Sequence, residues 1–129
     1  REESDYLPHN YTHNCVVYTG THDNDTVMGW YDTLKGADKK LCDDYLRLKN
    51  ADGESIPREQ IPWEFVRAAM SSVADMAIIP MQDYLGLGSE ARINIPSTLG
   101  INWMWRMGNG DFTKELAGRI RSMTKLYGR

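Results

Sequence analysis

Apolar residues gather in two short continuous runs, and polar residues follow each run at once. The first run, residues 16–19, is closed by Gly20 and predicts a short buried strand. The second run, residues 75–80, shows no alternation of polar and apolar positions, which predicts a strand buried on both faces. The polar residues after each run are therefore expected at the ends of strands.

Between and after these runs, apolar positions recur every three or four residues, which predicts helices. The first helix follows the opening strand, with Asp23 or Asn24 as its cap. A later helix begins at Pro62, since proline is tolerated in a first turn. The helices are expected over residues 27–34, over 39–49, from 62 onward and over 113–127, with a turn at 50–55 and loops at 1–14 and 86–113.

The order of elements is strand, helices, strand, long loop and helix. Alternating strands and helices argue for a parallel sheet of the α/β class. Two strands do not make a stable parallel sheet with both faces covered, and a barrel of eight β/α units takes ~250 residues. The pattern therefore looks incomplete as an isolated domain, because it supplies only about a quarter of such a barrel.

Composition excludes several classes of partner. The chain has 129 residues and a formal net charge of -3, so it has the length of one domain and no general attraction for phosphate backbones. Its C-terminal basic residues are spaced as the solvated face of a helix, and no nucleic-acid partner is expected. The longest apolar run is far shorter than the ~20 residues that span a bilayer, so no membrane partner is expected.

Cys15 and Cys42 have no partners at metal-ligand spacing and are expected to be buried, reduced thiols. One glycosylation pattern, residues 24–26, lies within the candidate site, where a glycan would block it, and this favours an intracellular protein. No signal peptide is visible. The chain begins with Arg1, and removal of an initiator methionine or a longer parent chain explains that start equally well.

Polar pairs follow both predicted strands. His22 and Asp23 come after the first strand, and Gln82 and Asp83 come after the second. Barrel enzymes place their chemistry at the carboxyl ends of strands. The open alternative for His22 and Asp23 is that they only cap the next helix. For Gln82 and Asp83 the alternatives are orienting a substrate, buttressing the first pair, or making structural hydrogen bonds.

Residues 23–25 also begin like a calcium-binding loop. Val27 and Met28 occupy the positions that need an oxygen ligand and a glycine, so no metal is expected. Asp25 is expected to cap the helix or to support the site from behind. His9 and His13 have no partners at ligand spacing and are expected to be surface residues.

Three groups of segments resemble the C-terminal part of the amylomaltases, which are 4-α-glucanotransferases. They read LPHN with VVYTGTHDNDT, then SVADMAIIPMQD with LGLG, and finally ARINIPSTLG with NWMWR. Their order and approximate spacing fit the family, and they cover nearly the whole chain. Ile95 and Ile101 differ from the residues found in many members, but neither has an assigned chemical role.

The resemblance implies the C-terminal part of a (β/α)8 TIM barrel, with residues 1–129 forming a fragment of the catalytic domain that ends in a helix. It implies a retaining transfer of α-1,4-glucan segments between maltooligosaccharides or starch-like glucans, without a cofactor. The implied aspartate nucleophile and glutamate acid/base belong to earlier strands, in an N-terminal remainder that the chain needs. The third carboxylate, Asp23, is implied to stabilise the transition state.

The remaining site residues are expected to hold the sugar. His22 can hydrogen-bond a second hydroxyl of the same glucose, and Asn94 resembles a family position near the bound sugar. Gln82 and Asp83 are included as candidate substrate contacts at the rim. Trp103 and Trp105 either stack on glucose rings or anchor a loop, with packing favoured.

Three alternatives to a transferase stay open: a non-catalytic glucan-binding remnant, an assembly fragment that needs a partner, and an α-glucan hydrolase. The presence of the two upstream carboxylates separates the first two from an enzyme. Transfer and hydrolysis differ in the acceptor that reaches the intermediate. The motifs look more bacterial than plant, which predicts a cytoplasmic location, with a plastid as the alternative.

Overall fold

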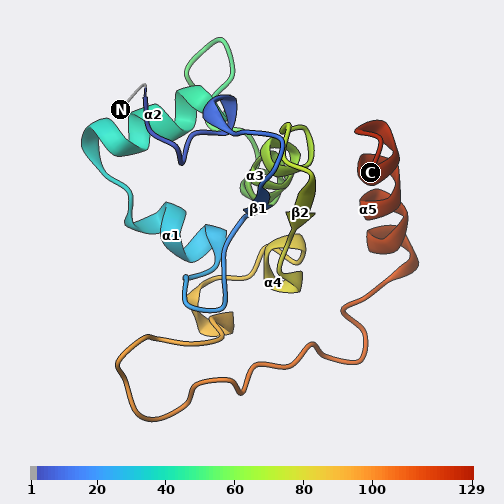
Figure 1. Cartoon of the computed structure of the whole chain (residues 1–129). Coiled ribbons are helices and arrows are strands. Elements are labelled where there is room, and N and C mark those ends of the chain that lie inside the picture. Colours follow the sequence, from blue (N-terminus) through green and yellow to red (C-terminus); the bar gives the residue numbers. More distant parts are fainter. Residues whose placement is uncertain (1–2) are drawn as a thin grey trace.

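A two-stranded parallel sheet lies at the centre of the chain (Figure 1). The computed structural model describes residues 3–129. Strand β1 (Val16–Tyr18) pairs with β2 (Met76–Ile78), and Val17 lies opposite Ala77. The parallel pairing predicted from the order of elements is confirmed.

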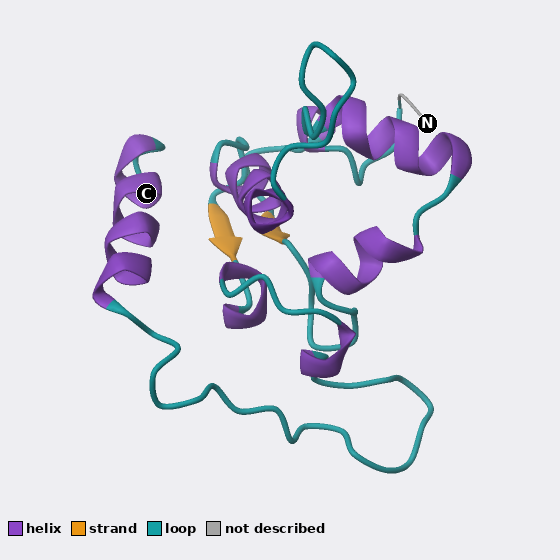
Figure 2. Ribbon diagram, turned by 180° about the vertical axis from the view of Figure 1, so that it is seen from behind, coloured by secondary structure: helices purple, strands orange, loops and turns teal. Residues whose placement is uncertain are grey.

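Helices connect the strands and follow them. Helices α1 and α2 lie on the β1 side of the sheet and α5 on the β2 side, as Figure 1 shows. Helix α3 lies against one face of the sheet, which is clear from behind in Figure 2. The bounds are α1 Val27–Thr33, α2 Gly36–Tyr45, α3 Ile61–Met70, α4 Met81–Tyr84 and α5 Lys114–Leu126, with short 3-10 turns η1 Pro8–Asn10, η2 Arg58–Gln60 and η3 Ser89–Ala91.

The predicted ends of two helices, α1 and α2, were wrong. The cap of α1 is Thr26, whose hydroxyl accepts a hydrogen bond from the Gly29 amide at 3.1 Å, because Asp23 and Asn24 belong to a separate turn. Helix α2 begins at Gly36 rather than at residue 39, and it ends at Tyr45 rather than at residue 49, since the chain turns through a left-handed Arg47 (φ 56°). The expected N-terminal loop contains η1, and its residues 1–2 lie outside the described part.

Strand β2 is not buried on both faces as predicted. Met76 is 54% exposed and Ile78 is 42% exposed, and their β1 neighbours Val16 and Tyr18 are exposed to a similar degree. Only the other face, with Val17, is covered by helices. The described residues therefore leave one apolar face of the sheet uncovered.

Helix α5 docks on α3 through the apolar stripe predicted for it. Met123 is buried against Trp63, Val66 and Met70, and the partly buried residues of the stripe pack around them. Thr113 caps the helix, because its hydroxyl accepts a hydrogen bond from the Leu116 amide at 3.1 Å. This docking closes the β2 side of the core.

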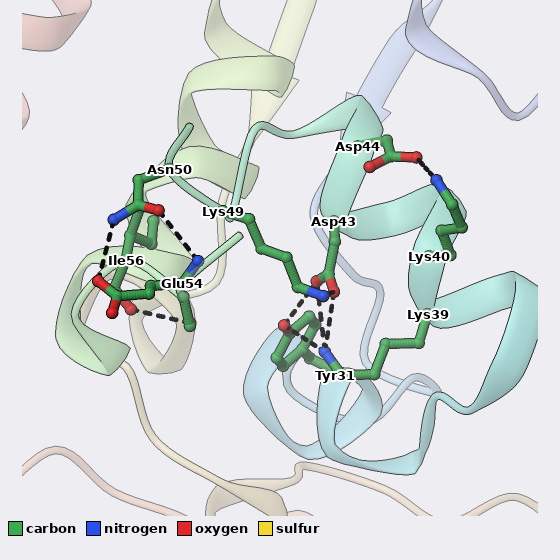
Figure 3. Close-up of polar contacts among 10 residues, drawn as sticks. Tyr31, Lys39, Lys40, Asp43, Asp44, Lys49, Asn50, Glu54 and Ile56 are labelled. Carbon is green, nitrogen blue, oxygen red and sulfur yellow. Dashed lines mark hydrogen bonds and ion pairs between the residues drawn. The ribbon is translucent and has the colours of Figure 1, made fainter. Parts of the chain in front are cut away.

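A buried carboxylate joins α1 to α2. Asp43 is 2% exposed. Figure 3 shows its carboxylate next to the Tyr31 hydroxyl and the ammonium groups of Lys39 and Lys49. The Tyr31 hydroxyl donates to Asp43 at 2.7 Å, and the Lys39 and Lys49 nitrogens lie 3.2 and 3.5 Å away. Burial raises the pKa of Asp43, but these hydrogen bonds and positive charges outweigh it, so the net pKa lies below the usual value.

Asp43→Ala should lower the free energy of unfolding by about 2 kcal/mol, because Tyr31 and both lysines lose a buried partner. The adjacent Asp44→Ala is the matched control. Asp44 forms a solvent-exposed ion pair with Lys40, so its loss should not measurably change the free energy of unfolding. The pKa of Asp43 is lower in the folded state than in the unfolded state. Its contribution to the free energy of unfolding is therefore complete above the unfolded-state pKa and is lost as the pH falls through the folded-state pKa. Urea unfolding of the two variants at several pH values tests this, and equal effects of both substitutions would contradict it.

Candidate active site at the carboxyl end of the strands

A tight turn after β1 presents His22 and Asp23 at its tip. Asn24 closes the turn, since its side-chain oxygen accepts from the Thr21 amide at 2.8 Å and from the Thr21 hydroxyl at 3.0 Å. The Asn24 amide donates in return to the Thr21 carbonyl at 3.1 Å. Side chains of this type favour turns because they hydrogen-bond nearby backbone groups. The turn therefore leaves both tip residues open to solvent.

Asp23 lies between an imidazole and an amide. Its Oδ1 accepts from the Asn94 side-chain amide at 2.8 Å, and its Oδ2 lies 3.3 Å from His22 Nε2. About half of the Asp23 side chain remains exposed, at 49%. The structure thus brings together three of the predicted site residues, although Asn94 is 71 positions away from Asp23 in the sequence.

Trp103 extends this cluster. Its ring lies 5.1 Å from the His22 ring, and its side chain is largely exposed. Its backbone has a φ of 63°, which is rare for a bulky residue, and its amide donates to the Ile93 carbonyl at 2.6 Å. Trp103 is therefore a contact of the site, and not only a residue that packs the loop.

Gln82 and Asp83 lie behind the turn, where both side chains are buried. Asp83 accepts from the Thr19 hydroxyl at 2.6 Å and from the Val27 amide at 2.9 Å, so its two oxygens join the beginning and the end of the turn. Gln82 donates to the Ala91 carbonyl at 3.2 Å. Of the roles left open by the sequence, these contacts support buttressing.

Asp25 supports the same turn from a second side. Its carboxylate accepts from the Ser89 hydroxyl at 2.6 Å and from the Thr26 amide at 2.8 Å. Gly29 lies beneath this pair, and a Cβ at this position would come within 2.3 Å of the Ser89 oxygen. Only glycine allows α1 to approach so closely. The space left between the turn and Gln82 is about 10 Å³, so the support is densely packed.

Arg92 is a site residue that the sequence did not single out. Its Nη2 donates to the Asp23 carbonyl at 2.7 Å, and its Nε donates to the Asn94 carbonyl at 2.9 Å. Arginine in a polar loop carries no local signal for such a role. The signal available was its place within the third segment of the family resemblance, two residues before Asn94.

No group of three or more potential metal ligands occurs among residues 3–129. Within that same part of the chain, no helix combines the length and the apolar character needed to cross a membrane.

A cavity of about 430 Å³ lies away from the Asp23 cluster, between the N-terminal segment and α1 to α3, and is lined mainly by apolar and aromatic side chains. The candidate site is the exposed cluster around Asp23, because its polar side chains follow the carboxyl end of β1 and converge on one carboxylate.

Burial raises the pKa of Asp83, and the nearby Asp25 charge adds to this, while the hydrogen bonds from Thr19 and Val27 oppose it. A raised folded pKa means that stability falls as the pH rises from the unfolded pKa through the folded one. Asp83→Asn has no titrating group at this position, so its stability should lack this pH dependence, and the unfolding free energy of wild type relative to the variant should fall as the pH rises. The amide can still accept from Val27 and can donate to the Thr19 oxygen, so the fold should be retained.

Asp83→Ala is the paired substitution, because it leaves the Val27 amide and the Thr19 hydroxyl without a partner. We expect it to cost about 2 to 3 kcal/mol of unfolding free energy. Thermal and urea unfolding at a series of pH values, from the usual carboxyl pKa upward, measure both variants. If Asp83→Asn and Asp83→Ala lowered the free energy of unfolding equally, the charge of Asp83, and not its hydrogen bonding, would hold the turn.

The fold and site define an α/β protein with a carboxylate, an imidazole and an amide at the end of parallel strands. A model of the 4-alpha-glucanotransferase family matches residues 1–112. A 4-alpha-glucanotransferase of Clostridium butyricum is 50% identical over 125 residues, which cover 96% of this chain and 24% of the relative. The chloroplastic/amyloplastic DPE1 enzyme of Arabidopsis thaliana is 45% identical over 98% of this chain and 21% of its own length.

A solved amylomaltase from Streptococcus agalactiae, in complex with acarbose, has a TM-score of 0.87 and 35% identity. The match covers 98% of this chain and 24% of that structure. The chain belongs to the 4-α-glucanotransferase family, and the resemblance found in the sequence is confirmed. It spans about a quarter of the length of these relatives.

Proposed function

We propose that this chain is the C-terminal part of a 4-α-glucanotransferase that moves α-1,4-glucan segments between maltooligosaccharides or starch-like glucans. One observation carries the proposal: Asp23, at the end of β1, has a half-exposed carboxylate flanked by His22 and Asn94. Family membership supports it, because the matching relatives are named 4-alpha-glucanotransferases. The chain itself contributes the part of the site that holds the sugar.

Asp23 acts on the sugar ring as its positive charge develops. When the glycosidic bond breaks, the ring flattens toward an oxocarbenium ion. A carboxylate bound to ring hydroxyls gains interaction energy as that charge grows, so it stabilises the transition state more than the ground state. His22 and Asn94 fix the direction of the carboxylate and donate to neighbouring hydroxyls.

The covalent steps belong to two carboxyl groups from earlier strands. An aspartate attacks the anomeric carbon, while a glutamate gives its proton to the departing glycosidic oxygen. An acceptor hydroxyl then attacks the glycosyl-enzyme, and the glutamate takes the proton back. No cofactor enters either step. Water in place of the acceptor would give hydrolysis, which is the nearest alternative reaction.

The rest of a (β/α)8 barrel completes this site. The uncovered sheet face, with Val16, Tyr18, Met76 and Ile78, supports this proposal, since the interior of such a barrel is filled by side chains of its strands. Residues 1–129 then form the C-terminal part of the catalytic domain and require the N-terminal remainder. We place the protein in the bacterial cytoplasm, with a plastid as the alternative, because the relatives include bacterial and chloroplastic enzymes.

Asp23→Asn in the full-length protein should lower the rate of glucan transfer about a thousandfold, because the amide cannot offset developing positive charge. Binding of maltooligosaccharides should stay within a few-fold of wild type, since the amide still forms hydrogen bonds. Asp52→Asn, which removes the same charge from an exposed remote turn, is the matched control and should transfer normally. Glucose release from maltotriose measures all three proteins, and wild-type turnover by Asp23→Asn would refute the role.

The isolated chain, residues 1–129, should release no glucose from maltotriose, because the nucleophile and the acid/base lie outside it. The full-length protein at the same concentration is the positive control. Glucose above the enzyme-free blank would mean that this chain holds a complete catalytic set of its own.

A further inference from the structure

A single side chain connects the backbones of the two residues that face the sugar. Arg92 donates from Nη2 to the Asp23 carbonyl and from Nε to the Asn94 carbonyl, at 2.7 and 2.9 Å. The Asn94 amide then reaches the Asp23 carboxylate at 2.8 Å. The three residues form a closed loop of hydrogen bonds across segments that lie 69 to 71 positions apart.

The segment that carries Arg92 is itself held in place. Its neighbour Ala91 is 1% exposed, and the Ala91 carbonyl accepts from Gln82. Ser89, three positions before Arg92, donates a hydrogen bond from its hydroxyl to the Asp25 carboxylate. The base of the Arg92 side chain therefore has a fixed position relative to the turn that carries Asp23. A displacement of the guanidinium would move Asp23 and Asn94 together.

Arginine is the side chain suited to this task. Its planar guanidinium offers several N–H donors in a rigid fork, whereas a lysine ammonium is a flexible point charge. Among residues 3–129, no carboxylate makes an ion pair with Arg92, so both donors serve backbone carbonyls. The side chain is partly buried, which limits competition from water.

We propose that Arg92 is a positioning residue, which sets the Asp23 carboxylate and the Asn94 amide at the distance the sugar ring requires. The proposal rests on the glucanotransferase function proposed above. It predicts a loss in kcat and not in KM, because the contact of Asp23 strengthens at the transition state. Misplacement of a reacting or binding group by about 1 Å can cost a hundredfold in rate.

The experiment compares Arg92→Ala, Arg92→Lys, Asn94→Ala and the Arg92→Ala/Asn94→Ala double variant in the full-length protein. Arg121→Ala is the control, since Arg121 lies on the exposed side of α5. Arg92→Ala should lower kcat about a hundredfold with KM within a few-fold of wild type. Its Tm should fall by less than about 3 °C.

Two readouts distinguish positioning from general support of the fold. Guanidinium ion at low millimolar concentration should restore part of the kcat of Arg92→Ala, while Arg92→Lys should stay impaired. The double variant should lose much less than the product of the single losses, because both substitutions remove the same arrangement of Asp23. Multiplicative losses, or a kcat loss that follows the fraction unfolded, would overturn the proposal. If Arg92→Ala does not fold, Arg92→Lys provides the same comparison with Asn94→Ala.

Hydrogen exchange separates this proposal from the proposed function. Amides in residues 20–26 should exchange faster in Arg92→Ala than in wild type, and this measurement needs no turnover. Absence of glucan transfer by wild type would refute the function, and faster exchange would then still support positioning of the turn. Unchanged exchange in residues 20–26 would overturn the positioning role whatever the activity.

Discussion

The buried carboxylate of Asp83 is the group on which the candidate site depends. With one oxygen on Thr19 and the other on the Val27 amide, it joins the last residue before the turn to the first residue of α1. A turn fixed at both ends has few conformations left, so the residues at its tip lose little further entropy when they bind. This arrangement costs free energy of desolvation, because the Asp83 carboxylate is buried and its pKa is raised by that burial.

The segment that begins with η3 and continues into the long loop completes the site from the opposite side. Three residues of one short stretch contact the turn. Ser89 donates to the Asp25 carboxylate, Arg92 donates to the Asp23 carbonyl, and Asn94 donates to the Asp23 carboxylate. Polar side chains placed on loops over a packed α/β layer are a common arrangement for binding sites. Here two loops define the direction of one carboxylate.

The same chain is well packed on one side and open on the other. Helix α3 and α5 share a core with Trp63, Val66 and Met123, and the Asp43 cluster joins α1 to α2. The opposite sheet face, with Met76 and Ile78, has no cover among the described residues. This asymmetry fits a chain that spans about a quarter of the relatives it matches.

Local pattern determined the elements of this protein: both strands, the start of α3 near Pro62 and the apolar stripe of α5 follow from residue spacing. It also placed His22 and Asp23 at a strand end, because a short apolar run closed by glycine is a local feature. Tertiary structure alone decided that the Asp83 carboxylate turns inward to Thr19 and Val27, and that Arg92 and Asn94 reach Asp23. These depend on contacts between segments 56 to 71 residues apart, and such contacts leave no trace in a local pattern of polar and apolar residues.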